Sequence, residues 1–562
     1  MFRDPRFVLV VAVAVALWFP LTQLDWFLEF EFGNYVVRSV EWAQELRAGH
    51  LYPRWSPDMY GGYGEPLFVF FAPAIYSVTG LLTALSIDPV LALKFVALCG
   101  SLLAGTGTYA LVYGETRNPD AALLSGIAYL AAPYRLGDLF ERGDFGEFCC
   151  IALLPVVLAL YLAASREARP FRARGLAACA SLVHAVMILT HTILGLWGTA
   201  LTGLVILIRC VILYRAGAWR RVPGLVVALG CAPGLAGAYV VPAMAYRGVT
   251  HSQALVEGFY RPQNHFLTLS DLFTRHSYLF EKNFTRMGPF IVIATVVTVV
   301  GAALKFKHGR AALPWMLASL ALLTLTLPVG YAFWEPGRLP LTQFIQFPWR
   351  LLGPAALTAS VALGIGAAAA SERLGQRLKT GLAIAGSTGL LLFIAWPYAT
   401  CTPVSSSNLP RDPDTIRSQI LSGTSADEFL PEHVAAKPRR PRGELVSATE
   451  NASVARSWSD GSTHSLALTA SKPAAVVRLA HYGFPGWNIR TRSGPTGATL
   501  DTDDKGMLSV HLPSPGEYQL EIAYGQPPLA WLGFAVTGLS LLTLGLMLLR
   551  GSSWWPYRIP AT

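Results

Sequence analysis

The chain has 562 residues, of which 53% are hydrophobic and only 14% are charged, and this excludes an ordinary soluble globular protein, which carries more surface charge. The formal net charge of +10 does not indicate nucleic acid binding, because the basic residues gather in short loops between apolar segments. These loops lie at 166–174, 215–221, 305–310 and 373–379. Basic loops of this kind face the cytoplasm, so we predict a polytopic membrane protein in the lipid bilayer.

Apolar segments of the length that crosses a bilayer, about 20 residues, recur along the chain. They predict a bundle with about 11 to 13 apolar segments, each near that length. The segments are 7–24, 67–86, 89–113, 120–135, 148–164, 176–194, 196–213, 223–245, 287–304, 313–333, 351–370, 380–399 and 528–549. Three apolar segments separate the loop 25–66 from the loop 136–147. Both loops are predicted to be external, which would require an even number of membrane crossings between them. One of the three segments 67–86, 89–113 and 120–135 is therefore predicted to be broken or re-entrant, and 67–86 is a candidate because Pro66 and Pro73 interrupt it.

The first external loop, 25–66, is rich in acidic and aromatic residues. Carboxylates beside an apolar span are costly unless they are solvated or used, and periodicity does not choose among Asp25, Glu29 and Glu31. Residues 34–47 have helical spacing and predict an amphipathic helix, either on the outer membrane face or packed on protein. Farther along, Arg54 and Trp55 offer a phosphate-binding and stacking surface, or belong to a tight structural loop.

Composition changes after residue 400, where the helical transmembrane module 1–400 is predicted to end. Residues 401–442 are rich in Ser, Pro, Asp and Arg and indicate an extracytoplasmic linker. Residues 443–527 contain alternating runs at 465–469, 475–479, 508–512 and 518–522, separated by turn residues. This pattern predicts a small extracytoplasmic β-sandwich. Residues 528–562 hold the last span and a cytoplasmic tail. The predicted fold class is an all-α polytopic membrane bundle with a small C-terminal β-sandwich.

The motifs of the first loop resemble a known family. The order of an acid, a helix, Gly-x-x-Tyr-Pro-Arg-Trp and Gly-Tyr-Gly-x-Pro is similar to the bacterial membrane family labelled "6-pyruvoyl-tetrahydropterin synthase-related", which belongs to the GT-C superfamily of glycosyltransferases. The family motif has an Asp, a His four residues on and an Arg three further. Here these positions are Glu31, Tyr35 and Arg38, so the carboxylate is kept and the His is replaced. Similar family signatures lie at 134–147, 190–191, 346–350, 428–431 and 482–487.

The resemblance implies a GT-C-like fold and an inverting hexosyl- or pentosyltransferase at the extracytoplasmic face of the bacterial inner membrane. Its partners would be a polyprenyl-phosphate sugar donor and a glycan, lipid or protein acceptor, often with a divalent cation such as Mg²⁺ or Mn²⁺. Glu31 would be the catalytic base, and Asp144 and Glu147 would orient substrate; Glu31 and Asp144 are the metal candidates. Substrate-binding candidates are Tyr35, Arg38, Arg54, Trp55, Arg142, His191 and Arg350. A transporter of lipid-linked sugars and a non-catalytic envelope-assembly protein are the alternatives.

Overall fold

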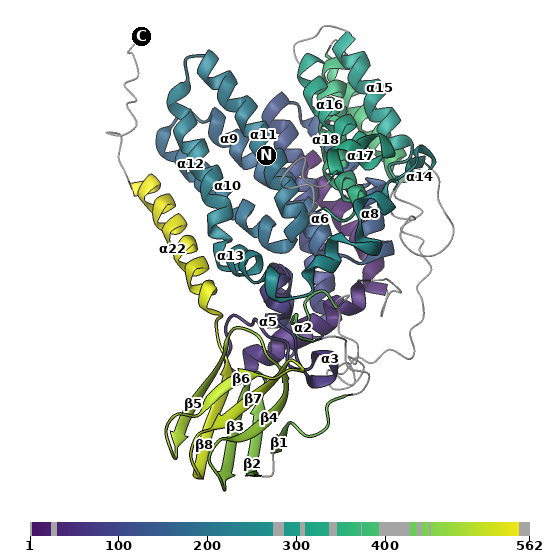
Figure 1. Ribbon diagram of the computed structural model, residues 1–562. Helices are drawn as coiled ribbons and strands as arrows, with labels where there is room; N and C mark the ends of the chain where they lie inside the picture. The colour runs from purple at the N-terminus through teal and green to yellow at the C-terminus, as the bar shows by residue number, and fades with distance from the viewer. Residues whose placement is uncertain are drawn as a thin grey trace.

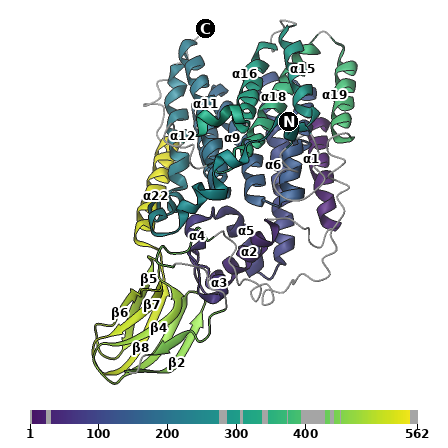
Figure 2. The ribbon, with the colours of Figure 1, turned by 45° about the vertical axis from the view of Figure 1, so that its right-hand side comes forward.

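The computed structural model describes residues 3–23, 31–273, 286–303, 309–335, 345–372, 374–392, 427–434, 441–448 and 451–549. In these residues a bundle of helices forms most of the molecule, and a two-sheet β-sandwich packs against one end of the bundle (Figures 1 and 2). The predicted fold class, an apolar helical bundle with a small C-terminal β-sandwich, is confirmed.

Seven helices of the described residues are long and apolar enough to cross a membrane, and two bent helix pairs raise the number to as many as nine. The seven are α1 (Pro5–Trp18, continued by a short 3-10 turn), α6 (Pro89–Thr116), α9 (Phe145–Arg166), α10 (Pro170–Thr190), α11 (Thr192–Arg215), α18 (Leu352–Ala370) and α22 (Pro528–Leu549). The bent pairs are α12 (Val222–Leu235) with α13 (Gly237–Ala245), at 58°, and α16 (Gly309–Thr326) with α17 (Tyr331–Trp334), at 90°. The chain is therefore a polytopic integral membrane protein.

The described residues contain fewer membrane-spanning helices than the sequence has apolar segments, because several of those segments fold as short helices. Segment 67–86 is broken at Pro73, in agreement with the prediction, into α4 (Leu67–Phe70) and α5 (Ala74–Ala84). Segment 120–135 forms α7 (Pro119–Leu130) and α8 (Pro133–Gly137), divided before a proline. Two more segments contain α15 (Pro289–Ala303) and α19 (Gln376–Leu390), and the remaining short helices are α3 (Met59–Gly62) and α14 (Leu269–Phe273).

Helix starts follow a common local pattern of a polar cap and a proline. Asp88 accepts a hydrogen bond from the backbone N–H of Leu91 before Pro89 begins α6. Asn118 caps α7 in the same way before Pro119. A side-chain oxygen satisfies an N–H group that the helix itself leaves unpaired, and proline needs no such partner.

The amphipathic segment predicted at 34–47 forms α2 (Phe32–Arg47), which packs on protein. Ser39 Oγ lies 2.7 Å from Thr79 Oγ1 of α5, and the Arg47 guanidinium donates to the Thr83 carbonyl oxygen at 2.7 Å. Much of the helix is buried, including Glu41 and Glu45. Of the two alternatives that the periodicity left open, the structure shows the second.

The β-sandwich consists of two four-stranded antiparallel sheets in the orders β1-β4-β7-β6 and β2-β3-β8-β5. The four runs predicted from alternation lie in β3 (Thr463–Ala470), β4 (Ala475–Tyr482), β7 (Met507–Leu512) and β8 (Gly516–Tyr524). The other strands, β1 (Val446–Ala448), β2 (Ala452–Asp460), β5 (Trp487–Ser493) and β6 (Thr499–Thr502), are short or largely exposed. Their weaker alternation explains why the sequence did not indicate them.

Candidate functional site

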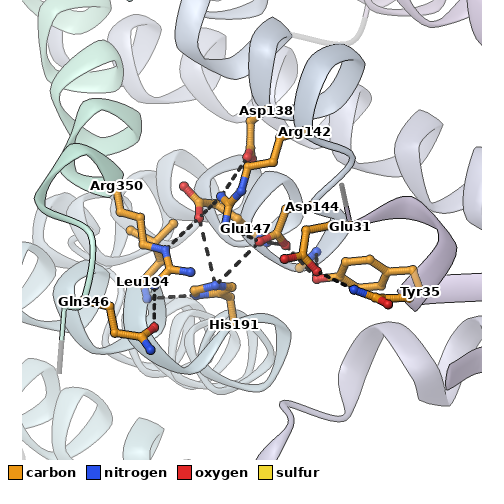
Figure 3. A network of polar contacts seen from close by, with 12 residues as sticks. Glu31, Tyr35, Asp138, Arg142, Asp144, Glu147, His191, Leu194, Gln346 and Arg350 are labelled. Atoms are coloured by element: carbon orange, nitrogen blue, oxygen red, sulfur yellow. Dashed lines mark hydrogen bonds and ion pairs between the residues drawn. The ribbon is translucent and has the colours of Figure 1, made fainter. Parts of the chain in front are cut away.

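A cluster of buried acidic and basic side chains lies within the helical bundle (Figure 3). It is built from the turn η2 (Asp138–Arg142), the start of α9, the junction of α10 with α11, and the turn η10 (Pro348–Leu351). Gly143, at φ 70°, lets the chain reverse from η2 into α9. At Gly146 a Cβ would lie 2.6 Å from the Tyr35 hydroxyl oxygen and 2.8 Å from the Thr190 carbonyl oxygen, so only glycine permits this close approach.

Glu147 is at the centre of the cluster and is fully buried. Arg142 Nη1 lies 2.6 Å from its Oε2, and Arg350 Nε lies 3.3 Å from the same oxygen. The Tyr134 hydroxyl donates a hydrogen bond to the other carboxylate oxygen. Arg350 also donates to Gln346 Oε1 at 3.0 Å. Charge-assisted hydrogen bonds from two arginines offset the loss of water around this carboxylate.

Asp144 caps α9 and is held by three different donors. The backbone N–H of Glu147 donates to Oδ1 at 2.9 Å, the Tyr35 hydroxyl donates to the same oxygen at 2.6 Å, and Arg142 Nη2 lies 3.0 Å from Oδ2. Burial alone would raise the pKa of Asp144, but Arg142 and these donors outweigh it and lower the pKa below its ordinary value. Burial and the Asp144 charge raise the pKa of Tyr35, so Tyr35 stays a hydrogen-bond donor.

Asp138 is the third acid of the cluster and differs from the other two. Burial, and next the nearby charge of Glu147, raise its pKa well above the ordinary value, although Arg142 Nη1 lies 3.2 Å from its Oδ1. The surroundings of Asp138 therefore favour its protonated form more than water does. The other two carboxylates of the cluster, Glu147 and Asp144, face the guanidinium groups of Arg142 and Arg350.

His191 joins α10 to α11 and turns one ring nitrogen toward both carboxylates. Its Nε2 lies 4.0 Å from Asp144 Oδ2 and 4.0 Å from Glu147 Oε2. Burial lowers its pKa to about 4, so the ring is neutral at pH 7. The backbone N–H of Leu194 donates to Nδ1 at 3.1 Å, which places the single ring proton on Nε2. His191 thus points an N–H group at the acids.

The cluster also has the donor types of a metal site. Asp144, Glu147 and His191 each offer a ligand atom, and these atoms lie within 4.8 Å of one another. Two carboxylates and an imidazole suit a divalent cation. In the arrangement described, Arg142 supplies the positive charge between the two carboxylates. A cation bound to His191 Nε2 would require Arg142 to withdraw and the ring proton to move to Nδ1, at the expense of the Leu194 contact.

Glu31 lies at the edge of this cluster and is partly exposed. Figure 3 shows it beside Asp144 and Tyr35. Its backbone N–H donates to the Arg142 carbonyl oxygen at 3.2 Å, and its carboxylate accepts from the Asn34 side chain at 3.3 Å. No arginine or lysine forms an ion pair with Glu31 within the part of the chain that the structure describes. The other two acids considered from the sequence, at positions 25 and 29, lie outside the described residues.

Of the remaining predicted residues, Arg38 lies near this cluster and interacts electrostatically with Glu31 and Tyr35. Arg38 faces α5, where it donates to the Tyr76 hydroxyl at 3.2 Å and lies 3.8 Å from the centre of the Phe71 ring. Arg54 and Trp55 connect the bundle to the sandwich instead. Arg54 donates to Gln526 Oε1 at 3.0 Å, and the Trp55 ring centre lies 5.0 Å from that of Tyr524 and 5.3 Å from that of Trp487.

Sequence reasoning assigned no role to Asp138, Tyr134 and Gln346, although all three lie within motifs that it singled out. Asp138 stands four residues before Arg142, and this helical spacing was a usable signal for an ion pair. Nothing in the sequence indicates that Gln346 adopts a left-handed backbone conformation, at φ 54°, beside Arg350.

The fold and the site together define the class of protein: a polytopic membrane protein whose polar site is a buried cluster of acids and arginines within the helical bundle. The family model described as "Family of unknown function (DUF6541)" matches residues 65–473, which is more than half of the chain. The chain therefore belongs to this family. The family named above from sequence motifs is a different one, so that resemblance stays a prediction. No curated protein matches the chain in sequence.

The chain is similar to several solved structures at low identity and with TM-scores below 0.5. The apo oligosaccharyltransferase of Archaeoglobus fulgidus has 12% identity and a TM-score of 0.43, with 77% of this chain and 62% of that chain covered. Arabinofuranosyltransferase AftD from Mycobacteria has 16% identity and a TM-score of 0.42, with coverages of 70% and 27%. The Archaeoglobus fulgidus oligosaccharyltransferase AglB in complex with an inhibitory peptide and a dolichol-phosphate has 13% identity and a TM-score of 0.41, with coverages of 76% and 61%. The chain spans less than two thirds of the length of each.

Proposed function

We propose that this protein is an inverting membrane glycosyltransferase, which transfers a sugar from a polyprenyl-phosphate donor to a hydroxyl group of an acceptor. The observation that carries this proposal is the contrast between Glu31 and its neighbours. Glu147 and Asp144 are held by arginines, whereas Glu31 is partly exposed and has no such ion pair among the described residues. Arg38 interacts electrostatically with Glu31. A partly exposed carboxylate that has no direct ion pair among the described residues is still suited to accept a proton.

In the proposed reaction, Glu31 accepts the proton of the acceptor hydroxyl as its oxygen attacks the anomeric carbon of the sugar. The bond between that carbon and the donor phosphate oxygen breaks, and the phosphate leaves with the electron pair, so the configuration inverts. Arg142 and Arg350 form ion pairs with Glu147 in the cluster beside Glu31 (Figure 3). In this proposal they stabilise the negative charge of the leaving phosphate. Preorganised cations need no rearrangement during the step, which lowers its barrier.

Asp144 has a positioning role in this proposal. Asp144 accepts a hydrogen bond from the Tyr35 hydroxyl of α2. This contact holds the first turn of α2, which Glu31 precedes, against the start of α9. A bound Mg²⁺ or Mn²⁺ would be held by Asp144 and Glu147, with His191 as a further ligand, and would supply additional positive charge beside the phosphate. We propose that the cluster and the sandwich lie on the extracytoplasmic side of a bacterial inner membrane, and that the sandwich contributes to binding a glycan, lipid or protein acceptor.

The test is sugar transfer in membranes that contain the protein and a radiolabelled polyprenyl-phosphate sugar. Glu31→Gln keeps the size of the side chain but removes the proton acceptor, so the rate should fall by about 10²–10⁴-fold while donor binding stays near normal. Asp88→Asn removes an exposed carboxylate at the start of α6 but keeps a good helix cap, and is the matched control. Full activity of Glu31→Gln would overturn the assignment of the base. Donor movement across the bilayer without sugar transfer would indicate a transporter.

A further inference from the structure

Arg135, in the short helix α8, is a buried cation that the proposed reaction does not use. It is only 1% exposed. Its Nη1 donates to the Leu130 carbonyl oxygen at 3.4 Å and its Nη2 donates to the Ser101 hydroxyl at 3.3 Å, and both hydrogen bonds are long. The guanidinium carbon also lies 4.4 Å from the centre of the Phe148 ring. The groups that hold Arg135 are therefore neutral.

No carboxylate neutralises Arg135 within the part of the chain that the structure describes. In those residues Arg135 forms no ion pair, and its buried Nε has no hydrogen-bond acceptor. A guanidinium stays charged at neutral pH, and a buried charge without a counter-ion destabilises a folded protein strongly. We therefore looked for a carboxylate that can reach Arg135 in another state of the molecule.

Asp138 is the acid placed to be that partner. Helix α8 continues directly into η2, so Asp138 follows Arg135 by three residues, and side chains at this spacing on a helical turn are neighbours. The charge of Asp138 acts on Arg135. Asp138 Oδ2 is buried and has no hydrogen-bond partner among the described residues, just as Arg135 Nε has none. A buried acceptor and a buried donor thus remain unused within one turn of each other.

In the structure Asp138 is paired with Arg142 instead (Figure 3). Its Oδ1 lies 3.2 Å from Arg142 Nη1, which is longer than the 3.0 Å from Arg142 to Asp144 Oδ2 and the 2.6 Å from Arg142 to Glu147 Oε2. Arg142 Nη1 carries two hydrogens and divides them between Asp138 and Glu147. If Asp138 turned away, it would release one of these N–H groups, while Glu147 and Asp144 would still hold the guanidinium in place.

We propose that Arg135 is a positioning residue for donor binding: when the donor phosphate approaches Arg142, the Asp138 carboxylate leaves Arg142 and pairs with Arg135. This role rests on the proposed function, in which Arg142 stabilises the leaving phosphate. Rotation of one short side chain makes an N–H group of Arg142 available to the phosphate, and Arg142 itself does not move. The exchange precedes the chemical step, so the cations are still preorganised when the sugar is transferred. Asp138 has a cationic partner in both states, which offsets its burial.

The experiment is titration of the detergent-purified full chain with farnesyl phosphate, a polyprenyl monophosphate without sugar, measured by isothermal titration calorimetry. Arg135→Gln should weaken binding about tenfold, because Asp138 then has no second cation and keeps competing with the phosphate for Arg142. Asp138→Asn removes the competing charge, so in that background Arg135→Gln should change binding by less than about twofold. Arg6→Gln is the matched control, because Arg6 pairs with Asp120 at the opposite end of α7. This control should bind farnesyl phosphate like the unaltered protein.

Unfolding temperatures in detergent provide a second test, which needs no ligand. In the unaltered protein, Arg135→Gln should change the unfolding temperature little, because Arg135 has no counter-ion to lose. Once Arg142→Gln has removed the other cation, Asp138 should turn to Arg135, and Arg135→Gln should then lower the unfolding temperature by several degrees. If Arg142→Gln does not fold, Arg142→Lys takes its place, because lysine lacks the planar fork that contacts several carboxylates at once, and the change should have the same direction.

Three outcomes would overturn the exchange between Arg142 and Arg135. The first is an equal weakening of farnesyl phosphate binding by Arg135→Gln with and without Asp138→Asn, which would show that Arg135 acts only through the packing of α8. The second is unweakened binding in Arg135→Gln, and the third is additive unfolding temperatures in the Arg135 and Arg142 variants. Failure of the unaltered protein to bind farnesyl phosphate would instead overturn the proposed function, and the role of Arg135 in donor binding with it.

Discussion

The acid cluster and the contact between α2 and the sandwich both bury carboxylates, and the two regions differ in the groups that surround these carboxylates. In the acid cluster, Arg142 and Arg350 form ion pairs with Glu147, and Arg142 also forms one with Asp144. At the contact between α2 and the sandwich, Glu45 is equally buried, but the Ser462 hydroxyl donates to it at 2.6 Å and the nearest basic group is His50, at 4.0 Å. Burial lowers the pKa of His50, which is therefore not a cation at neutral pH.

The pKa of Glu45 follows from these surroundings. Burial raises it to about 8, although hydrogen bonds from Ser462 oppose the shift. Glu45 is thus largely protonated at neutral pH, whereas the carboxylates Glu147 and Asp144 of the acid cluster are paired with arginines. A buried carboxylate stays charged only where a nearby cation offsets its lost hydration. This condition is met in the acid cluster and is not met at the contact between α2 and the sandwich.

The largest expected effect comes from removing the cation that the cluster shares. Arg142→Gln leaves Glu147 and Asp144 buried with one arginine fewer, and breaking a buried pair in this way typically costs about 3–5 kcal/mol. We expect the largest drop in thermal unfolding temperature of the variants considered, measured in detergent, together with loss of sugar transfer.

The control for this prediction is an exposed ion pair on the sandwich. Arg492 lies 2.5 Å from Glu521, with side chains 51% and 30% exposed. Exposed pairs contribute about 0–1 kcal/mol, so Arg492→Gln should change the unfolding temperature little. A comparable drop in both variants would mean that the cluster is no more dependent on its arginine than the surface is.

Arg350→Lys sharpens the comparison by keeping the charge and removing the planar fork. A lysine cannot contact both Glu147 and Gln346 in the way that Arg350 does at 3.3 and 3.0 Å. We expect sugar transfer to fall by roughly ten- to a hundredfold, mainly through weaker donor binding, with a small change in stability. Near-normal donor saturation in steady-state kinetics would show that Arg350 only anchors η10.

The two regions were unequally predictable from the sequence. The helical bundle and the four main strands follow from apolar length and alternation, and the motif positions at Asp144, Glu147, Arg142, His191 and Arg350 were identified through a family resemblance. The raised pKa of Asp138 depends on burial that only packing creates. The contact of Tyr35 with Asp144 joins residues 109 positions apart, and no local pattern encodes it. The linking contacts of Arg54 were missed for the same reason, since its partner Gln526 is 472 positions away.

Glu45→Gln tests the other side of the comparison through pH. The folded-state pKa of Glu45 is raised to about 8 from an ordinary 4.5, so the folded protein binds the proton more tightly than the unfolded chain. Its contribution to stability is therefore complete below pH 4.5 and is lost as the pH rises to 8. Glutamine does not ionise, so the variant does not lose this stability as the pH rises. The unfolding temperature of the variant, relative to that of the unaltered protein, should therefore increase by a few degrees between pH 5 and pH 8. A constant difference over this range would show that Glu45 is ionised in the folded protein.

Ser462→Ala gives the smallest expected effect and examines the same contact from the sandwich side. The Ser462 hydroxyl donates to Glu45 Oε2 at 2.6 Å, and its backbone N–H, which the substitution keeps, also stabilises the carboxylate. Loss of one hydroxyl hydrogen bond costs about 0.5–1.5 kcal/mol when the acceptor is neutral and about 1.5–3 kcal/mol when it is charged. The loss of stability should therefore be modest at pH 6, where Glu45 is protonated, and larger at pH 9, where it is ionised. In the Glu45→Gln background the acceptor stays neutral at every pH, and Ser462→Ala should then cost the same at pH 6 and pH 9. A pH-dependent cost in that background would mean that a different group titrates at this contact.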